Sequence, residues 1–431
     1  MNFRAISLTG AALTTALLLG ACGDDSNGTA KPAPTTTLAT APERDRVDLE
    51  EPTFSRPTEI TNPLFPISEL TQVIQLGEEG GAAVRNEITL LPDTKLIEWN
   101  GKQIETRVSQ FVAYEERRVK EVAVDFFAQA DDGAVWYFGE EVTNYEDGAV
   151  ADHEGTWLAG KDGPPGMIMP AAPAKGDVYR PENIPGLVFE EVTVNAVDQT
   201  VDGPRGPVTG AIVSRELLMD GTGEDKTFAP GYGEFSFEVA ADEEDVGLAL
   251  AVPTDAIAEP VPAELTTILS SALDLAIVEL GNAAAAFENR TAPKALDAQL
   301  TAAVVALTRA VTDDDAPLGK QAAIDVAHAS LDLQLQYRAA AEVDLARLDV
   351  WARQAVLDSE NDESENVASD VVILDAIWQR TRHTVGADTQ AAITQQLDDV
   401  RAAVDDEDLA AAARAANALQ ASLAGLAQSP S

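Results

Sequence analysis

A change of composition near residues 253–262 is the feature that most constrains how this chain can fold. Most of the glycines, prolines and aromatic residues precede this boundary, whereas the sequence after it is rich in alanine and leucine and poor in glycine. Aromatic and β-branched residues favour strands, and alanine and leucine favour helices. A chain of 431 residues also has enough material for two hydrophobic cores. The sequence therefore predicts an α+β protein with an antiparallel β domain over residues 57–250 and an α-helical bundle over residues 262–428.

The first half has the pattern of an antiparallel sheet built from hairpins. Three runs of aromatic and β-branched residues, Val122–Phe127, Val135–Phe138 and Glu154–Trp157, are separated by the turn sequences Asp131-Asp132-Gly133 and Glu146-Asp147-Gly148. Glycine accepts the positive φ angle that tight hairpin turns require. Further strands are expected at Val84–Leu91, Lys95–Ile97, Gln103–Tyr114, Phe189–Val197, Val208–Leu218 and Asp225–Phe228. Because no helix-length pattern lies between these runs, we expect a β-meander or a half-barrel rather than a parallel sheet.

Three segments of the β half carry a resemblance to known sequences. They are Asn62-Pro63-Leu64-Phe65-Pro66, Trp136-Tyr137-Phe138-Gly139 and Ala229-Pro230-Gly231-Tyr232-Gly233. Over about residues 60–235 the chain resembles a group of exported bacterial β-domain proteins that have no assigned activity. The resemblance implies a shared β-fold, and it implies no activity, cofactor or catalytic residue. Some exported sheets of this general kind curve into half-barrels that hold an acyl chain.

The second half has the periodicity of about five or six helices. Pro262, Pro293 and Pro317 each stand at the start of an apolar pattern with three- and four-residue steps, and proline is favoured at the first helical position. The expected helices cover about residues 262–280, 293–307, 318–357, 366–385, 389–404 and 406–427. Short connections predict up-and-down packing of neighbouring helices. Charged residues interrupt each apolar face, so no segment has the pattern of a membrane-spanning helix.

The N-terminus has the features of a cleaved export signal. Arg4 provides a positive charge, Ala5–Leu19 forms an apolar stretch, and two small residues precede the only cysteine of the chain. The apolar stretch is shorter than the roughly 20 residues that cross a bilayer. The run Leu19-Gly20-Ala21-Cys22 resembles the signal-peptidase recognition motif of bacterial lipoproteins. The resemblance implies a signal peptide over residues 1–21 and a lipid on the Cys22 sulfur that anchors the exported protein to the outer face of the cell membrane.

Residues 22–56 are expected to form a disordered, lipidated tether between this anchor and the β domain. The segment Lys31–Thr37 has few large apolar side chains, so burial cannot offset its ordering entropy. Two or three acyl chains, at about 0.8 kcal/mol per buried methylene, would make the attachment close to permanent. The membrane is therefore the partner that the sequence predicts.

The chain carries a formal net charge of −44, and its excess of acidic residues is evenly distributed. Residues 51–250 contain 38 acidic and 14 basic residues, and residues 251–431 contain 29 and 11. No basic stripe is available to replace the counterions of phosphates, so nucleic acid is not an expected partner. An even distribution indicates a solvated anionic surface. A saline environment and diffuse binding of divalent cations both remain open as its cause.

The search for catalytic and cofactor motifs is mostly negative. The sequence contains neither a phosphate-binding loop nor a Gly-x-Ser-x-Gly nucleophile elbow. The closest match, Gly221–Thr227, lacks the second glycine before lysine and is expected to form a hairpin turn. His153 lies in an Asp-His-Glu sequence, but no second histidine follows at the spacing of a zinc-protease helix. We therefore predict no cofactor and nominate no catalytic residue.

One set of residues has the spacing of a weak candidate metal site. Asp325, His328 and Asp332 stand at positions i, i+3 and i+7, which places them along one helix face. Such a face could bind a metal ion if another helix supplied further ligands. The favoured alternative is a surface histidine paired with neighbouring aspartates. His383 is expected to complement the dipole at a helix end.

These features lead to three functional hypotheses. The first is a membrane-anchored extracytoplasmic lipoprotein without enzymatic activity, which binds or presents something outside the membrane. The second is a carrier of a lipid or another apolar ligand inside the β domain. The third is a carboxylate-dependent hydrolase. A deep apolar cavity in the sheet would favour the carrier, and a cleft with convergent carboxylates, one of them desolvated, would favour the enzyme.

Overall fold

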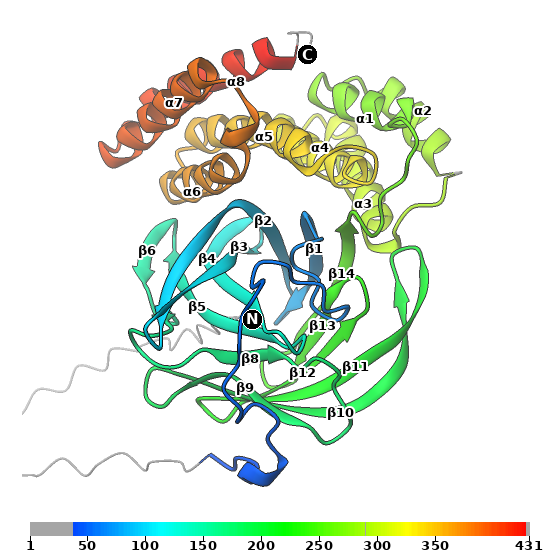
Figure 1. Cartoon of the computed structure of the whole chain (residues 1–431). Helices are drawn as coiled ribbons and strands as arrows, with labels where there is room; N and C mark the ends of the chain where they lie inside the picture. Colours follow the sequence, from blue (N-terminus) through cyan, green and yellow to red (C-terminus); the bar gives the residue numbers. More distant parts are fainter. Residues whose placement is uncertain (1–37, 289, 428–431) are drawn as a thin grey trace, which may run out of the picture.

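The computed structural model describes residues 38–427 except residue 289. The expected signal peptide, Cys22 with its recognition residues and the first part of the expected tether lie outside the described residues. Figure 1 shows the helices gathered over one side of a curved sheet. The α+β fold class, with an antiparallel sheet followed by a helical domain, is confirmed.

Fourteen strands in the described part of the chain form one open sheet, and all of its ladders are antiparallel. The strands are β1 (Gln72–Glu79), β2 (Ala82–Trp99), β3 (Lys102–Glu115), β4 (Arg118–Gln129), β5 (Val135–Glu146), β6 (Ala149–Asp152), β7 (Trp157–Leu158), β8 (Gly166–Met169), β9 (Val178–Ile184), β10 (Val188–Gly203), β11 (Gly206–Leu218), β12 (Gly223–Ala229), β13 (Gly233–Val239) and β14 (Glu244–Val252). Their order is β6-β5-β4-β3-β2-β1-β14-β13-β12-β11-β10-β9, while β7 and β8 both pair with β5.

The local hairpins of the sheet follow the turn sequences. The predicted turns at residues 131–133 and 146–148 join β4 to β5 and β5 to β6, and Gly148 adopts a φ angle of 74°. Of the sequence Gly221–Thr227, only Gly221 and Thr222 lie in the predicted turn, and residues 223–227 belong to β12. The strand β1 was not predicted, and it joins the two halves of the sheet by pairing with β14.

The two arms of the curved sheet approach each other where β8 meets β9. A side chain on Gly166 of β8 would overlap the carbonyl oxygen of Pro181 on β9, so this approach depends on the absence of a Cβ atom. The inner face of the sheet is filled by one large hydrophobic core. Trp136, Tyr137 and Trp157 all lie in this core.

The first described residues pack against the β domain instead of standing free. The amide of Val47 donates to the Val178 carbonyl at 2.9 Å, and the Arg180 amide donates to the carboxylate of Asp48 at 3.0 Å. The ring of Phe54 contacts Phe138 edge to face, with 5.4 Å between centroids. The part of the expected tether from residue 38 to residue 56 is therefore ordered, because it supplies an aromatic side chain and hydrogen-bonding groups to the sheet.

The first and last of the three segments that carry the resemblance contact each other. The amide of Gly231 donates to the Pro63 carbonyl at 2.8 Å. The buried Asn62 side chain donates to the carbonyl oxygens of Gly133 and Pro170 at 3.1 and 2.9 Å. The opening and closing segments thus bind each other and the turn that precedes β5.

The helical domain contains eight α-helices among the described residues, rather than the five or six that were expected. They are α1 (Ala263–Leu273), α2 (Ile277–Phe287), α3 (Lys294–Thr312), α4 (Ala316–Gln334), α5 (Ala340–Glu360), α6 (Ser364–Thr381), α7 (Ala387–Asp405) and α8 (Leu409–Ala427). The expected helix at 318–357 is divided because the Gln336 carbonyl accepts a hydrogen bond from Ile257 at 2.7 Å, outside the helix. The first expected helix is divided at Leu275, which has a φ angle of 54°.

The helices cover the outer face of the central strands. Alternate residues of β3 point to opposite sides, so Phe111 faces the core inside the sheet while Val112 and Tyr114 join a core with the helices. Trp351 of α5 and Ile377 of α6 complete that second core. None of the described helices is long and apolar enough to cross a membrane.

We predict that Gly166→Ala lowers the free energy of unfolding by about 1–3 kcal/mol, because the added methyl group forces β8 away from β9. Gly247→Ala on β14 is the matched control, since no described atom lies within 4 Å of its added Cβ. The control should change stability by less than about 0.5 kcal/mol. Denaturant unfolding of both variants measures the difference, and equal stability would contradict the close approach.

Candidate functional site

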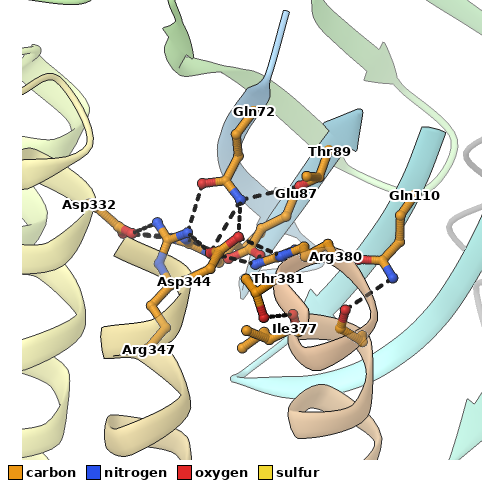
Figure 2. Close-up of polar contacts among 12 residues, drawn as sticks. Gln72, Glu87, Thr89, Gln110, Asp332, Asp344, Arg347, Ile377, Arg380 and Thr381 are labelled. Atoms are coloured by element: carbon orange, nitrogen blue, oxygen red, sulfur yellow. Dashed lines mark hydrogen bonds and ion pairs between the residues drawn. The ribbon is translucent and has the colours of Figure 1, made fainter. Parts of the chain in front are cut away.

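Six ionic side chains form a network between the sheet and the helices. This interdomain network consists of Arg85 and Glu87 on β2, Asp332 on α4, Asp344 and Arg347 on α5, and Arg380 on α6. Three guanidinium groups thus face three carboxylates, so the network is electrically balanced. Figure 2 shows five of these side chains converging from the strand and the helices.

Two arginines occupy the centre of the interdomain network. Arg347 donates to Asp332 at 2.6 Å and to Asp344 at 2.7 Å. Arg380 donates to Glu87 at 2.7 Å and to Asp344 at 2.9 Å. All five of these residues are at most 4% exposed. Because both partners of each pair are desolvated, the pairs are far more sensitive to loss of a partner than surface ion pairs.

Arg85 closes the network at its solvent edge. It donates to both carboxylate oxygens of Asp332, at 2.7 and 2.9 Å, and to Glu87 at 2.8 Å. Burial acts to raise the pKa of Glu87, but Arg380 and the two other guanidinium groups outweigh it. The pKa of Glu87 therefore lies well below its usual value, and the carboxylate stays ionised.

The first residue of β4 is a further arginine that contacts the helices. Arg118 donates to Asp358 at 2.8 Å and to Asp370 at 3.2 Å, and the amide of Val119 donates to the Ser369 hydroxyl at 2.9 Å. Burial, followed by the charge of Asp358, raises the pKa of Asp370 well above its usual value. One cation therefore faces two carboxyl groups, and burial favours the protonated form of Asp370.

A cavity of about 400 Å³ lies next to the interdomain network, between strands β1–β3 and helices α3–α5. We call it the interdomain cavity. Leu76 and Val84 of the sheet, Ala303 and Ala306 of α3 and Trp351 of α5 form its apolar wall. Ligand sites are commonly mostly apolar cavities of roughly this volume at domain boundaries.

Three residues that line this cavity each carry a polar atom that is shielded from solvent and lacks a hydrogen bond within the described structure. These atoms are Oε1 of Gln299, Nε2 of His328 and the hydroxyl oxygen of Tyr114. Burial lowers the pKa of His328 to about 3, so its imidazole is neutral, and the ring packs on Trp351 with 4.9 Å between centroids. Buried polar atoms without partners cost free energy, and a ligand with matching groups would recover it.

The structure separates the three residues of the candidate metal site. Both oxygens of Asp332 are bound by Arg85, and Asp325 accepts a hydrogen bond from Gln321 at 3.2 Å. His328 is partly buried and lines the interdomain cavity with its ring packed on Trp351, whereas the alternative that we favoured from the sequence was a surface histidine. The helix face therefore supplies ion-pair partners and one wall of a cavity.

A second cavity, of about 140 Å³, lies inside the curved sheet. Its lining includes Phe111, Phe237 and several carboxyl groups, among them Glu79 and Glu244, which are opposite each other on β1 and β14. Burial, followed by the charges of Glu79 and Asp242, raises the pKa of Glu244 to about 8. A protonated acid beside a second carboxylate suits acid–base chemistry, but this cavity is smaller than common ligand sites.

The other two histidines line neither the interdomain cavity nor the cavity inside the sheet. His153 contacts the Val142 carbonyl through Nδ1 at 2.8 Å in the turn after β6. His383 lies in the 3-10 turn Arg382–Thr384 that follows α6. Arg380 lies in the last turn of α6 and belongs to the interdomain network.

Comparison with known proteins gives no family for this chain. No protein-family model matches the sequence, and none of the curated proteins matches it. The candidate sites therefore depend on the geometry alone.

Helical spacing in the sequence indicates His328 as a candidate site residue, but it does not indicate the neighbours of His328 in the cavity. Gln299 and Tyr114 come from α3 and β3, so no spacing within one helix relates them to His328. Arg347 and Arg380 had a visible signal, because each interrupts the apolar face of an otherwise buried helix. A charged residue at a core-facing helical position indicates a buried partner elsewhere.

We predict that Arg380→Met lowers the free energy of unfolding by about 3–5 kcal/mol, because Glu87 and Asp344 lose a buried counter-charge. Arg309→Met is the control, since its pair with Asp313 lies on the surface and contributes about 0–1 kcal/mol. Denaturant unfolding measures both variants. Equal losses in the two would show that the interdomain network does not hold the domains together.

Proposed function

We propose that the protein is an exported, membrane-anchored lipoprotein that binds a small neutral molecule in the interdomain cavity. The observation that carries this proposal is one largely apolar cavity of about 400 Å³ whose lining residues include three with an unpartnered buried polar atom. A ligand with an apolar body would pack on Trp351 and the alanines of α3. Its polar groups would meet Gln299, His328 and Tyr114.

The charges around the cavity favour a neutral ligand. Arg85 and Glu87 already pair with each other, and Arg117 lies 3.7 Å from Asp325. A charged ligand would have to break one of these pairs or remain uncompensated in a desolvated site, and both cost free energy. The net charge of −44 opposes the approach of anions in particular.

The unpartnered atoms also indicate which groups the ligand carries. The amide oxygen of Gln299 only accepts, so it requires a donor such as a hydroxyl or an amide N–H. The neutral imidazole of His328 and the phenol of Tyr114 can each donate or accept. The matching class is a compact alcohol or amide with an apolar face.

The location rests on the N-terminal sequence. The resemblance of residues 19–22 to a lipoprotein motif supports lipidation of Cys22 and attachment to the outer face of the cell membrane. Such an anchor suits a protein that captures a small molecule outside the cell and keeps it near the membrane.

The two other hypotheses have less support. The interior of the described sheet is filled by side chains, and its cavity of about 140 Å³ is bordered by carboxyl groups, which does not suit an acyl chain. The carboxyl pair Glu79 and Glu244 is the feature that a hydrolase would use, and the small volume around it disfavours a sugar or peptide substrate.

We predict that the neutral fluorescent probe N-phenyl-1-naphthylamine binds the full chain at one saturable site. Ala306→Phe, on the exposed rim of the cavity, should weaken binding at least about tenfold because the ring obstructs the opening. Ala298→Phe is the matched control, since this alanine is exposed on the same helix but does not line the cavity. Fluorescence titration gives both affinities. If both variants bind the probe like the parent chain, the cavity is not the site.

We predict that Cys22→Ser releases the protein from the membrane fraction and abolishes labelling with radioactive palmitate, because the sulfur that would carry the lipid is absent. Cell fractionation and autoradiography measure the two effects. The parent chain is the reference. Labelling of the variant at the level of the parent would show that Cys22 is not the lipidated residue.

A further inference from the structure

Strands β10–β13 carry a buried cluster of charged side chains on the inner face of the sheet. The carboxylates of Glu190, Glu216, Glu224 and Glu234 surround the ammonium group of Lys226. Nζ of Lys226 lies 2.9 Å from Glu216, 3.5 Å from Glu234, 3.6 Å from Glu224 and 3.9 Å from Glu190. None of the five residues is more than 5% exposed. We call this group the Lys226 cluster.

Among the described residues, the Lys226 cluster has more negative than positive charge. One ammonium group faces four carboxylates, and an uncompensated buried charge costs several kcal/mol. Burial and then the neighbouring Glu216 raise the pKa of Glu190 well above its usual value, and burial raises that of Glu224 to about 8. A bound metal cation would supply part of the missing positive charge.

The positions of the oxygens suit a metal cation. Glu190, Glu216 and Glu224 each offer a carboxylate oxygen, and these three atoms lie within 4.8 Å of one another. Glu216 and Glu224 are directly opposite each other on β11 and β12, so the ladder holds them in place. A set of oxygens without nitrogen or sulfur selects hard cations such as Ca²⁺ and Mn²⁺.

A tyrosine next to the cluster gives independent support. Tyr179 on β9 is fully buried, and its hydroxyl has no hydrogen bond within the described structure. It is opposite Val192, which in turn is opposite Glu216, so the tyrosine and this glutamate share the inner face of the two strands that flank β10. Burial and then the charges of Glu216 and Glu190 raise the pKa of Tyr179 well above its usual value.

We propose that Glu190, Glu216, Glu224 and the hydroxyl of Tyr179 form a binding site for one divalent cation of the calcium class. With the cation bound, two metal charges and the Lys226 ammonium oppose four carboxylates, which leaves a net charge of about −1 instead of −3. A polar path leads to this site from the cavity inside the sheet. Asn86 at that cavity donates to Gln75, and Gln75 donates to Glu234, at 3.4 and 3.3 Å.

The test uses Tb³⁺, a luminescent substitute for Ca²⁺, with the full chain stripped of metal by a chelator at about pH 8. We expect one saturable site whose emission is excited through tyrosine and is displaced by Ca²⁺. Glu224→Gln should weaken Tb³⁺ binding at least about tenfold. Glu238→Gln, which changes an exposed acid on β13, is the matched control and should leave binding unchanged.

Two outcomes would overturn the proposal. One is the absence of saturable Tb³⁺ binding. Weak Tb³⁺ binding at many equal sites counts as this outcome, because an acidic surface binds cations in that way. The other is equal affinity of the parent chain and Glu224→Gln. If Glu224→Gln does not fold, Tyr179→Phe decides, because it keeps the ring in the core and removes only the hydroxyl. This variant should bind Tb³⁺ more weakly with lower sensitised emission, and unchanged binding and emission would reject the site.

Discussion

The electrical balance of the interdomain network is the constraint on which the two-domain arrangement depends. Its three arginines and three carboxylates come from one strand and three helices, and their removal from water costs several kcal/mol for each unpaired group. Apolar contacts such as Tyr114 on Trp351 tolerate a shift of the helices over the sheet. The bidentate contact of Arg85 with Asp332 does not tolerate such a shift. The interdomain network therefore selects one position of the helices over the sheet, and this position fixes the walls of the interdomain cavity.

Local features of the fold could be predicted, and long-range ones could not. The composition change at residues 253–262 and the glycine turns gave the domains and the hairpins of β4–β6 and β11–β12 because they are encoded by neighbouring residues. The pairing of β1 with β14 joins segments about 170 residues apart in the sequence. The periodicity of hydrophobic residues within a segment does not predict which distant segment pairs with it. The division of the expected helix at 318–357 has the same origin, since Ile257 on the linker binds the Gln336 carbonyl.

The candidate sites were harder to predict because the sequence contains 73 acidic residues, and their pattern alone does not distinguish the few buried ones from the many exposed ones. Helical spacing indicated that Asp325, His328 and Asp332 lie on one helix face. It cannot show that Arg85 of β2 binds Asp332. A usable signal was present in the strands. Glu190 lies between Val188 and Val192, at a position of β10 whose neighbours on the same face are core residues. An acid at an inward position of an alternating strand indicates a buried charge that needs a counter-charge.

The packing of the first described residues on the sheet has a consequence for a chain that is anchored through its N-terminus. Residues 41–48 lie beside β9 and β10, whereas the helices cover the other end of the sheet (Figure 1). A chain attached through its N-terminus would hold β9 and β10 towards the lipid headgroups. The opening between α3 and the sheet would then point outward, where solutes reach it without crossing the crowded layer next to the bilayer.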